Sequence, residues 1–513
     1  MPDVVIVGGG PVGLMLACEI ALAGAEPLVL ERLPERLTTP KANGLVGQVV
    51  RLLDHRGLYQ RVTGRAGAPV PMPAFFFGAL PLPLAELDTN PMFALPIPQR
   101  ELEALLAERA AELGVEIRRG HEVRSYTQDD DGVTLQVETG AGVLELRASY
   151  LVGCDGGHST IRHQAGIAFP GVSSDNLVAR TANIAAPSWA SVTEGGRLMV
   201  RGVGEVQAGF HRTEHGVLTL AALDPERPIV NTLEWEDTPD GEWPGSGTPM
   251  TLDELRESVH RVLGVDLPLE PPPPGPAILR RLVGRNTRLA ERYRDGRVFL
   301  AGDAAHVHSA SGGPGLNLGL QDAANLGWKL AAAAQGWATP GLLDSYETER
   351  HAVGARVFMQ TQAQTALMAP GGDVTALREL FGELLQRQEN LQHIADLMAG
   401  SDVRYNMGDT DPHPLTGYFA PELTLRTAAG PQRLAELVRD GRPTLIDLTE
   451  DGALDQAAGG WDGRVASITA SSDNPPTRGL LVRPDGYVAW ALATDEPDKD
   501  GLEDALTTWF GEP

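Results

Sequence analysis

The stretch DVVIVGGGPVGLMLACEIALAGAEPLVLERL (residues 3–33) decides the fold class of this 513-residue chain. The apolar strand VVIV runs directly into the pattern GxGxxG, formed by Gly8, Gly10 and Gly13. Apolar residues then recur at helical spacing, and a second apolar strand ends in Glu31, roughly 20 residues after the first glycine. This order of strand, glycine-rich turn, helix, strand and acidic residue predicts a βαβ unit that binds a dinucleotide.

Each residue of the pattern has a physical task. Gly8 allows the tight turn, Gly10 lets the backbone approach a pyrophosphate, and Gly13 lets the helix pack closely on the strand. Pro11 suits the first helical turn, where its missing N–H would have no partner, and the helix N-terminus attracts phosphate. Glu31 is expected to accept a hydrogen bond from an unphosphorylated adenosine ribose, which favours FAD or NAD over NADP at this site.

Two later stretches also place an Asp beside a Gly at the end of an apolar strand. SYLVGCDGGHSTIR (149–162) contains Asp155, and GRVFLAGDAAH (296–306) contains Asp303. The second continues as GDAAHVHSASGGPGLNLG, a glycine-rich run that opens a helix. The positive end of that helix would stabilise negative charge on a group above the glycine run.

In this order, the three motifs resemble the class A FAD-dependent aromatic monooxygenases of the p-hydroxybenzoate hydroxylase fold, and in particular their aromatic-polyketide hydroxylases. The stretches ERYRDGRVFLAGDAAH, NLGLQDAANLGWKLAA, LLDSYETERHAVG and LVRPDGYVAWA extend the resemblance over essentially the whole chain. The resemblance implies an α/β fold with a Rossmann-like FAD-binding domain, an inserted β-sheet substrate domain and a C-terminal thioredoxin-like domain. It also implies reduction of FAD by NADPH or NADH, reaction with O₂ to a C4a-hydroperoxyflavin, and hydroxylation of a polycyclic aromatic substrate.

The resemblance further implies roles for single residues. Asp303 would bind the ribityl chain, Leu316 and Asn317 would offer amides to the pyrimidine end of the flavin, and Gln99 would touch FAD. Asp155, with Arg162 as a weaker match, would serve both FAD and the pyridine nucleotide. The complete set of candidate cofactor contacts is Gly8, Gly10, Pro11, Gly13, Glu31, Arg32, Lys41, Gln99, Asp155, Asp303, Gly315, Leu316 and Asn317.

No side chain is assigned as a catalytic acid or base, because the flavin carries the difficult chemistry. Phe210 and His211, in the segment expected to form the substrate sheet, are candidates to face the substrate. His306 and His308 stand two residues apart, but no carboxylate or cysteine cluster completes a metal site, so no metal is expected.

The chain departs from the family pattern in two places. In PKANGLVGQVV, Lys41 and Gln48 replace arginines that the family places near flavin and nucleotide, and lysine lacks the bidentate fork of arginine. In the glycine-rich run, Ala310 replaces a rigid proline beside the reactive face of the flavin, which predicts a changed peroxide lifetime or reaction type. Pro314 stands just before a helix, where its missing N–H costs little.

The order of strand and helix signals, the Gly- and Pro-rich stretches between them and the resemblance together predict three domains. They are a discontinuous FAD-binding domain (1–75, 99–180 and 280–395), a substrate-binding domain (76–98 and 181–279) and a thioredoxin-like domain without a CxxC motif (405–513).

Composition limits the partners. The net charge of −26 disfavours nucleic acid and anionic membranes, and no run is long and apolar enough to span a membrane. The two cysteines, Cys18 and Cys154, form no CxxC pair, and the chain enters a strand at once, so a cytoplasmic monomer or homodimer is expected. Baeyer–Villiger insertion into a polycyclic ketone, a plain NAD dehydrogenase and a non-catalytic flavin- or drug-binding protein remain as alternatives.

Overall fold

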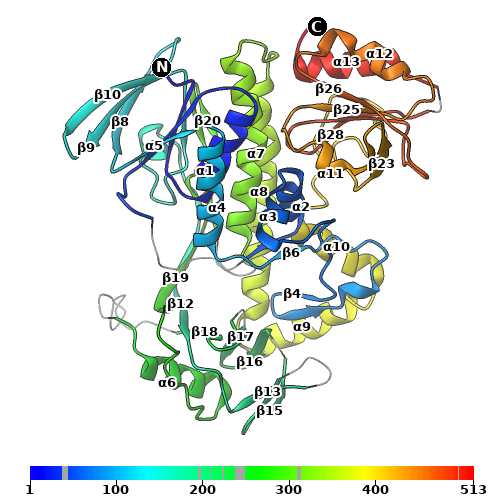
Figure 1. The fold of residues 1–513 in the computed structure, drawn as a ribbon. Coiled ribbons are helices and arrows are strands. Elements are labelled where there is room, and N and C mark those ends of the chain that lie inside the picture. The colour runs from blue at the N-terminus through cyan, green and yellow to red at the C-terminus, as the bar shows by residue number, and fades with distance from the viewer. Residues whose placement is uncertain are drawn as a thin grey trace.

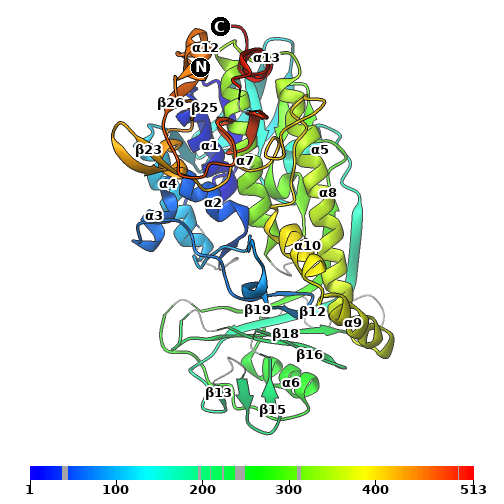
Figure 2. The same ribbon diagram turned by 90° about the vertical axis from the view of Figure 1, so that its right-hand side faces the viewer.

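The structure is a computed structural model of the chain. It describes residues 1–36, 44–193, 198–207, 209–221, 224–236, 249–275, 277–308, 313–494 and 496–513. Figure 1 shows an upper body, which contains both chain termini, and a lower body built around a second sheet. The long helix α8 (Leu342–Met368) runs from the upper body down to the lower sheet, which the side view in Figure 2 makes clear.

A six-stranded sheet with the order β20-β21-β11-β1-β2-β7 organises the upper body. Its strands are β1 (Val4–Val7), β2 (Pro27–Glu31), β7 (Glu116–Arg119), β11 (Tyr150–Gly153), β20 (Arg294–Asp295) and β21 (Val298–Leu300). The strands from β21 to β7 pair in parallel, so their carboxyl ends share one edge of the sheet. The four residues of β1 are all buried, as expected for a strand covered on both faces.

Helices α1 (Pro11–Leu22), α4 (Gln99–Glu112) and α7 (Pro314–Ala334) pack together beside this sheet. Two glycines let α7 approach α1 closely. A Cβ at Gly327 would lie 2.5 Å from Cβ of Glu19, and a Cβ at Gly319 would lie 2.7 Å from the side chain of Val12. Gly319 and Gly327 therefore serve the packing of α7 on α1.

Smaller elements complete the upper body. An antiparallel sheet contains β8 (Glu122–Gln128), β9 (Val133–Thr139) and β10 (Gly142–Ala148). The short elements are α2 (Gln48–His55), α3 (Leu58–Thr63), α5 (Thr160–Gln164), η3 (Gly302–Ala304), β3 (Leu45–Val46) and β6 (Ala94–Leu95).

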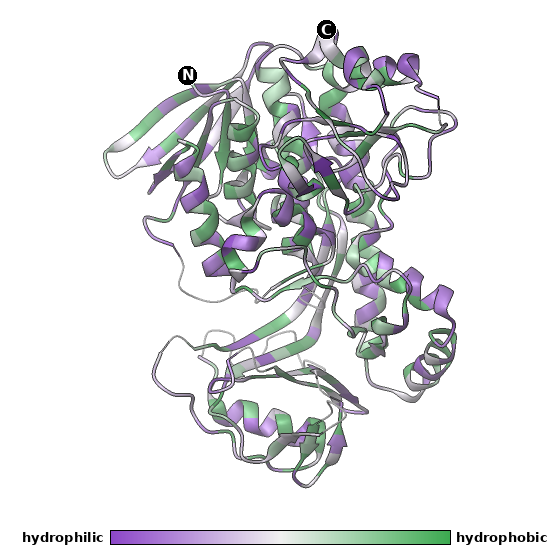
Figure 3. Cartoon of the chain, turned by 45° about the vertical axis from the view of Figure 1, so that its right-hand side comes forward, coloured by the Kyte–Doolittle hydropathy of each residue, from purple (hydrophilic) through white to green (hydrophobic). Residues whose placement is uncertain are grey.

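The lower body is a six-stranded sheet with the order β16-β17-β18-β12-β19-β22. Its strands are β12 (Gly171–Asn183), β16 (Gly209–Thr213), β17 (Gly216–Ala221), β18 (Ile229–Trp235), β19 (Leu279–Leu289) and β22 (His306–Val307). Helix α6 (Leu252–Leu263) and the strands β13 (Ala190–Val192), β14 (Leu198–Val200) and β15 (Gly204–Val206) accompany this sheet. Buried and half-buried residues alternate along β18, because each strand has two different faces. Figure 3 shows both hydrophobic and hydrophilic residues along the strands of this sheet.

The two faces of the lower sheet have different neighbours. Leu218 and Val230 pack in the core beneath α6, whereas Val217 and Trp235 face the end of α8, where Met368 lies. Strand β12 begins before the predicted domain limit at residue 180 and continues beyond it, so the chain enters the lower body without an intervening loop.

The end of α8 carries a helical extension. Helices α9 (Gly372–Leu384) and α10 (Gln388–Ala399) share a hydrophobic core with β4 (Phe75–Phe77), β5 (Leu80–Leu82) and η1 (Leu84–Glu86). In this core, Phe77 stacks on Phe381 with ring centroids 5.9 Å apart. Much of the 76–98 segment, predicted to belong with the substrate sheet, thus packs against helices.

The C-terminal part contains a four-stranded sheet with the order β26-β25-β27-β28, in which β27 alone runs against its neighbours. Its elements are β25 (Thr444–Asp447), α12 (Ala453–Ala458), η4 (Gly459–Trp461), β26 (Ala466–Thr469), β27 (Gly479–Val482), β28 (Val488–Ala491) and α13 (Lys499–Phe510). A hairpin of β23 (Thr424–Thr427) and β24 (Gly430–Arg433), followed by α11 (Leu434–Leu437), precedes it. The mixed α/β class and its thioredoxin-like C-terminal part agree with the fold predicted from the sequence.

Buried ionic contacts join this C-terminal part to the long helices. Glu349 on α8 accepts hydrogen bonds from Lys329 on α7 at 2.7 Å and from both terminal nitrogens of Arg483 at 2.7 and 2.9 Å. Arg483 also pairs with Asp485, and all four side chains are buried. Within the ranges that the structure describes, no helix is long and apolar enough to cross a membrane.

Candidate cofactor-binding site

A groove of about 890 Å³ crosses the carboxyl edge of the parallel sheet, where β1, β2, β11 and β21 end. In open α/β sheets, ligands bind at this edge because glycine-rich turns and helix N-termini gather there. Most of the predicted cofactor contacts line the groove, namely Gly8, Gly10, Pro11, Glu31, Arg32, Gln99, Asp155, Asp303, Gly315 and Leu316. The tertiary structure therefore brings the three sequence motifs to one site.

The first glycine turn is shaped by close backbone contacts. Gly8 has a φ of +114°, and a Cβ there would lie 2.3 Å from the carbonyl oxygen of Cys154. A Cβ at Gly10 would meet nothing within 4 Å, so that side of the turn is open to the groove. Pro11 begins α1, which places the amides and the positive end of the helix at the groove.

Glu31 is held by the turn that it faces. Its Oε2 accepts a hydrogen bond from the Gly9 amide at 2.7 Å, and its Oε1 accepts one from the Leu33 amide at 2.8 Å. A carboxylate oxygen has two lone pairs, so each oxygen can accept a further hydrogen bond. The arrangement fits a carboxylate that accepts from the hydroxyl groups of a ribose.

Asp155 lies where β11 ends, across the groove from the glycine turn. Its Oδ2 accepts a hydrogen bond from the Ile161 amide at 3.3 Å, whereas its Oδ1 is buried without a partner among the described residues. Burial raises the pKa of Asp155 above its ordinary value. A buried carboxylate oxygen of this kind requires a donor, and the groove is where a ligand could supply one.

Arg162 has a structural role. Its guanidinium donates to the carbonyl oxygens of Ala304 and Gly157, both at 2.8 Å, and lies 3.8 Å from the centroid of the Phe169 ring. Arg162 is buried and ties the second motif to the third. It is not part of the described lining of the groove.

The turn that contains Gly302 and Asp303 is held in place by a buried carboxylate. Asp322 of α7 accepts hydrogen bonds from the Gly302 amide at 3.2 Å, from Nε2 of His306 at 2.6 Å and from Nε of Arg350 at 2.8 Å. Burial by itself raises the pKa of Asp322, but the neighbouring His306 and Arg350 outweigh burial and hold this pKa below its usual range. These bonds fix the turn that carries Asp303 into the groove.

The N-terminus of α7 forms the far wall of the groove. Gly313 caps the helix with a φ of +66°. Pro314, predicted to stand just before the helix, is its first residue. The amides of Gly315 and Leu316 have no intrahelical acceptor, because the first residues of a helix precede the first i to i−4 bond. Both residues line the groove, so their N–H groups and the helix dipole can act on a negatively charged ligand.

His308 lines the groove, although the sequence motifs did not indicate a cofactor contact at this residue. Both of its ring nitrogens are buried without a partner among the described residues, and burial lowers its pKa to about 3. The ring stacks on that of His306 with centroids 5.4 Å apart, and its Cδ2 is 4.0 Å from a Cβ built on Gly315. A neutral imidazole therefore stands beside the N-terminus of α7.

Gln99 and Asn317 differ in their surroundings. Gln99 begins α4 at the groove, and its amide nitrogen donates to Glu103 at 2.8 Å. Asn317 is buried inside α7, where Oδ1 accepts from the Val46 amide and Nδ2 donates to the Gly313 carbonyl, both at 3.2 Å. Asn317 is not among the described groove residues, so its side chain braces the wall instead of facing the groove.

The remaining predicted positions lie away from the groove or outside the described residues. Gly13 is buried in α1, where a Cβ would lie 2.0 Å from the Gly8 carbonyl oxygen, so it serves close packing of helix and strand. Lys41 and Ala310 lie outside the described residues. Gln48 is a buried first residue of α2 and is not part of the described groove lining.

The two candidates on the lower sheet also lie away from the groove. The ring of Phe210 packs edge to face on Phe76, with centroids 5.7 Å apart. His211 lies next to it on β16 and pairs with Leu218 of β17 in the antiparallel ladder. Phe210 thus belongs to the packed contact between the sheet and the helical extension.

Comparisons with known proteins agree with this geometry. The family profile described as FAD binding domain matches residues 1–361, and the one described as aromatic-ring hydroxylase, C-terminal, matches residues 413–513. The chain is 42% identical to an anhydrotetracycline monooxygenase of Streptomyces rimosus, with 100% of this chain and 99% of that protein covered.

Solved structures that match over the whole chain have the same fold. An anhydrotetracycline hydroxylase from Streptomyces rimosus superposes with a TM-score of 0.85 at 40% identity, covering 100% of this chain and 99% of that one. A Diels-Alderase from the biosynthetic pathway of pyrroindomycins superposes with a TM-score of 0.80 at 36% identity, covering 100% of both chains.

Proposed function

Because the chain belongs to the family of FAD-dependent aromatic-ring hydroxylases, we propose that it hydroxylates a polycyclic aromatic substrate of the polyketide type, using NADPH or NADH and O₂. The observation that carries this proposal is the convergence of the three motifs on one groove at the carboxyl edge of the sheet. FAD supplies the electron uptake and the oxygen activation when it is bound. The protein must hold it, orient the substrate and exclude water.

Different residues of the groove bind different parts of FAD. The turn of Gly8 and Gly10 and the N-terminus of α1 hold the pyrophosphate, and Glu31 accepts from the adenosine ribose. Asp303 binds the ribityl chain. The unsatisfied Oδ1 of Asp155 and the open space above Gly10 support this assignment, because both leave room or capacity for a ligand.

The N-terminus of α7 would stabilise negative charge on a bound flavin. The amides of Gly315 and Leu316 lie in the first turn of the helix at the groove, and the helix dipole adds to their effect. This local field is needed because the net charge of the chain is −26, which repels anions at long range. The α7 terminus would therefore lower the cost of placing negative charge on the cofactor in the groove.

The finer organisation follows from the same proposal. The proposed domains keep the predicted limits, with an FAD-binding domain (1–75, 99–180 and 280–395), a substrate domain (76–98 and 181–279) and a thioredoxin-like domain (405–513). Strands β12 and β19 of the lower sheet extend across the limits at residues 180 and 280. The enzyme works in the cytoplasm as a monomer or homodimer, and its two free cysteines suit a reducing compartment.

The test is to purify the protein, record the spectrum of bound flavin, and follow NADPH and NADH oxidation with tetracyclic phenols and ketones. We expect yellow protein, oxidation stimulated by the substrate, and a product one oxygen heavier. Colourless protein that takes up no added FAD would overturn the proposal. The structure of the product separates hydroxylation from ring expansion, since both add one oxygen.

A second candidate function has its own observation. The 36% identical structure over 100% of both chains is that of a Diels-Alderase, so this fold also serves cyclisation. Cyclisation leaves the mass of the substrate unchanged and consumes no NADPH. A product of unchanged mass, formed equally with and without NADPH, would favour this second function.

A further inference from the structure

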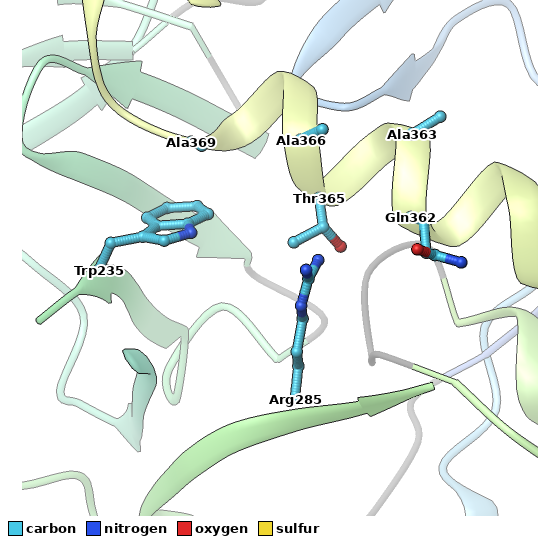
Figure 4. A pocket seen from close by; sticks show the side chains of 7 residues that line it. All are labelled: Trp235, Arg285, Gln362, Ala363, Thr365, Ala366 and Ala369. Carbon is cyan, nitrogen blue, oxygen red and sulfur yellow. The ribbon is translucent and has the colours of Figure 1, made fainter. Parts of the chain in front are cut away.

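A second pocket, of about 410 Å³, lies between the lower sheet and the last turns of α8 (Figure 4). Trp235 of β18 and Arg285 of β19 form the sheet side, and Gln362, Thr365 and Ala366 form part of the helix side. In Figure 4, Arg285 rises from its strand toward Thr365, and the Trp235 ring stands beside it. The pocket thus combines an aromatic face, a cation, polar side chains and a helix surface of small residues.

The guanidinium of Arg285 has no hydrogen-bond or ion-pair partner among the residues that the structure describes. Two other arginines of β19 have protein partners. Arg281 forms a salt bridge with Glu254, and Arg288 donates to the Phe169 carbonyl at 2.9 Å. Arg285 is therefore the β19 arginine whose positive charge is available to a ligand in the pocket.

Arg285 lies beside an irregularity in the backbone. Ser174 of β12 pairs with Arg285 and Val178 pairs with Val283, so the register shifts opposite Gly284, the residue before Arg285. Gly284 has a φ of +80°, a left-handed conformation that favours glycine. Bulges of this kind redirect a side chain and are frequent beside active sites. Arg285 thus lines the pocket directly beside such an irregularity.

The pocket lies within reach of the cofactor groove. Along β19, Arg285 is three residues from Arg288, which pairs with Val307, and the next residue, His308, lines the groove. A strand advances roughly 3.3 Å per residue, so Arg285 stands about 10 Å along the sheet from the groove. A substrate with several fused rings could extend from the groove to the pocket, whereas a single-ring phenol would be too short.

We propose that this pocket binds the ring of the substrate remote from the reacting carbon, and that Arg285 selects an anionic enolate or carboxylate on that ring. Trp235 stacks on the ring, and Gln362 can donate a hydrogen bond to a carbonyl oxygen of the ring. The Thr365 hydroxyl donates its proton to the Thr361 carbonyl at 2.8 Å, so its oxygen can accept a hydrogen bond from a hydroxyl group of the ring. Arginine suits this role because its planar fork binds two oxygens at once. This inference rests on the proposed function, since it assumes that a polycyclic substrate is oxidised at the groove.

The test compares two linear tetracyclic phenols, one with an ionised 1,3-diketone on its terminal ring and one with that diketone blocked as a neutral methyl enol ether. Their dissociation constants for the FAD-loaded enzyme are measured by calorimetry. Arg285→Gln should weaken binding of the anionic probe by about 10- to 100-fold, as expected for a lost charge-assisted hydrogen bond, and should hardly change binding of the neutral probe. Arg285→Lys should give a smaller loss, because it keeps the charge without the fork.

Two further variants separate this role from a general disturbance. Trp235→Leu should weaken binding of both probes by a similar factor, because stacking does not depend on the charge of the ligand. Arg280→Gln, on the same strand but outside the pocket, is the matched control and should leave both constants within about twofold. Bound FAD content and circular dichroism verify that each variant is folded.

The outcomes distinguish this inference from the proposed function. If Arg285→Gln weakens both probes equally or neither, while the wild type still hydroxylates them, the charge-selective role of Arg285 is wrong and the function stands. If wild type holds FAD but yields no oxygenated product, and Arg285 nevertheless selects the anionic probe, the pocket is a binding site and the hydroxylase function is wrong.

Discussion

Replacement of Asp322 by Asn is expected to destabilise the protein by about 3–5 kcal/mol, the usual effect of removing one partner of a buried ion pair. Asp322 and Arg350 are both completely buried, and the carboxylate accepts from Nε of Arg350 at 2.8 Å. The other guanidinium nitrogens contact the Tyr405 hydroxyl and the Leu318 carbonyl, which carry no negative charge at neutral pH. The variant would therefore leave a buried cation without a counter-charge.

The same substitution should weaken FAD binding. An Asn side chain offers one acceptor atom to the three donors that Asp322 now receives, and its NH₂ would face another donor. The turn of Gly302 would move, and with it Asp303. If one charge-assisted hydrogen bond between Asp303 and the cofactor is lost, the dissociation constant of FAD rises by about tenfold or more.

Stability is measured by urea unfolding of the apoprotein, because bound FAD would add stability by mass action. The double variant Asp322→Asn/Arg350→Met removes both charges and should be more stable than Asp322→Asn alone. The pKa of Asp322 is lowered by folding, so its contribution is present above the ordinary value of about 4 and is lost as the pH falls through the folded value. Wild type and Asp322→Asn should thus converge in stability below about pH 4.

Two results would refute this reasoning. One is a loss of less than about 1 kcal/mol in Asp322→Asn, since that would mean that the buried arginine needs no counter-charge. The other is a double variant whose loss equals the sum of the two single losses, which would mean that the two groups are not coupled.

Three further predictions concern the groove and the C-terminal part. Gly8→Val should give colourless protein, because a Cβ would lie 2.3 Å from the Cys154 carbonyl oxygen; retained flavin absorbance would contradict this. His308→Leu should weaken FAD binding by about 2- to 10-fold, which is the effect of losing one neutral hydrogen bond. The loss, measured by fluorescence titration, should be constant from pH 5 to 8, because burial lowers the pKa of His308 to about 3. A loss that varies with pH in this range would mean that His308 changes its charge there. Glu349→Gln should lower the free energy of unfolding by about 3–5 kcal/mol and speed proteolysis of the C-terminal part. Adding Lys329→Met should restore part of the resistance to proteolysis. An unchanged digestion rate in Glu349→Gln would mean that the ion pairs of Glu349 do not hold the C-terminal part to the long helices.

Features that depend on neighbouring residues were predictable from the sequence. The strand Val4–Val7 and the position of Glu31 at the end of β2 agree with the structure, because apolar runs and glycine turns act over short distances. Pro314 at the first position of α7 follows from the chemistry of proline alone. The family resemblance and the flavin-dependent monooxygenase class are confirmed by the comparisons.

Features that depend on distant contacts were not predictable. Asn317 was predicted to offer its backbone amide to the flavin, and its side chain has a separate task that the sequence did not indicate, since it accepts a hydrogen bond from Val46, 271 positions away. Phe210 packs against Phe76, a contact that no local pattern indicates. Strand β12 crosses the predicted domain limit because the alternation of a long strand does not reveal where one body ends and the next begins.

The sequence by itself determined that the chain contains a dinucleotide-binding βαβ unit and two further acidic strand ends, since GxGxxG, Glu31, Asp155 and Asp303 are readable one segment at a time. The tertiary structure decided how these segments meet, and which buried groups hold them there. No sequence motif indicated a role for Asp322. It holds the Gly302 turn and Arg350 only because α7, α8 and that turn come together away from water, where an unpaired charge is costly. Burial and long-range contacts are properties of the folded chain, and they decide which charges are paired and which remain available to a ligand.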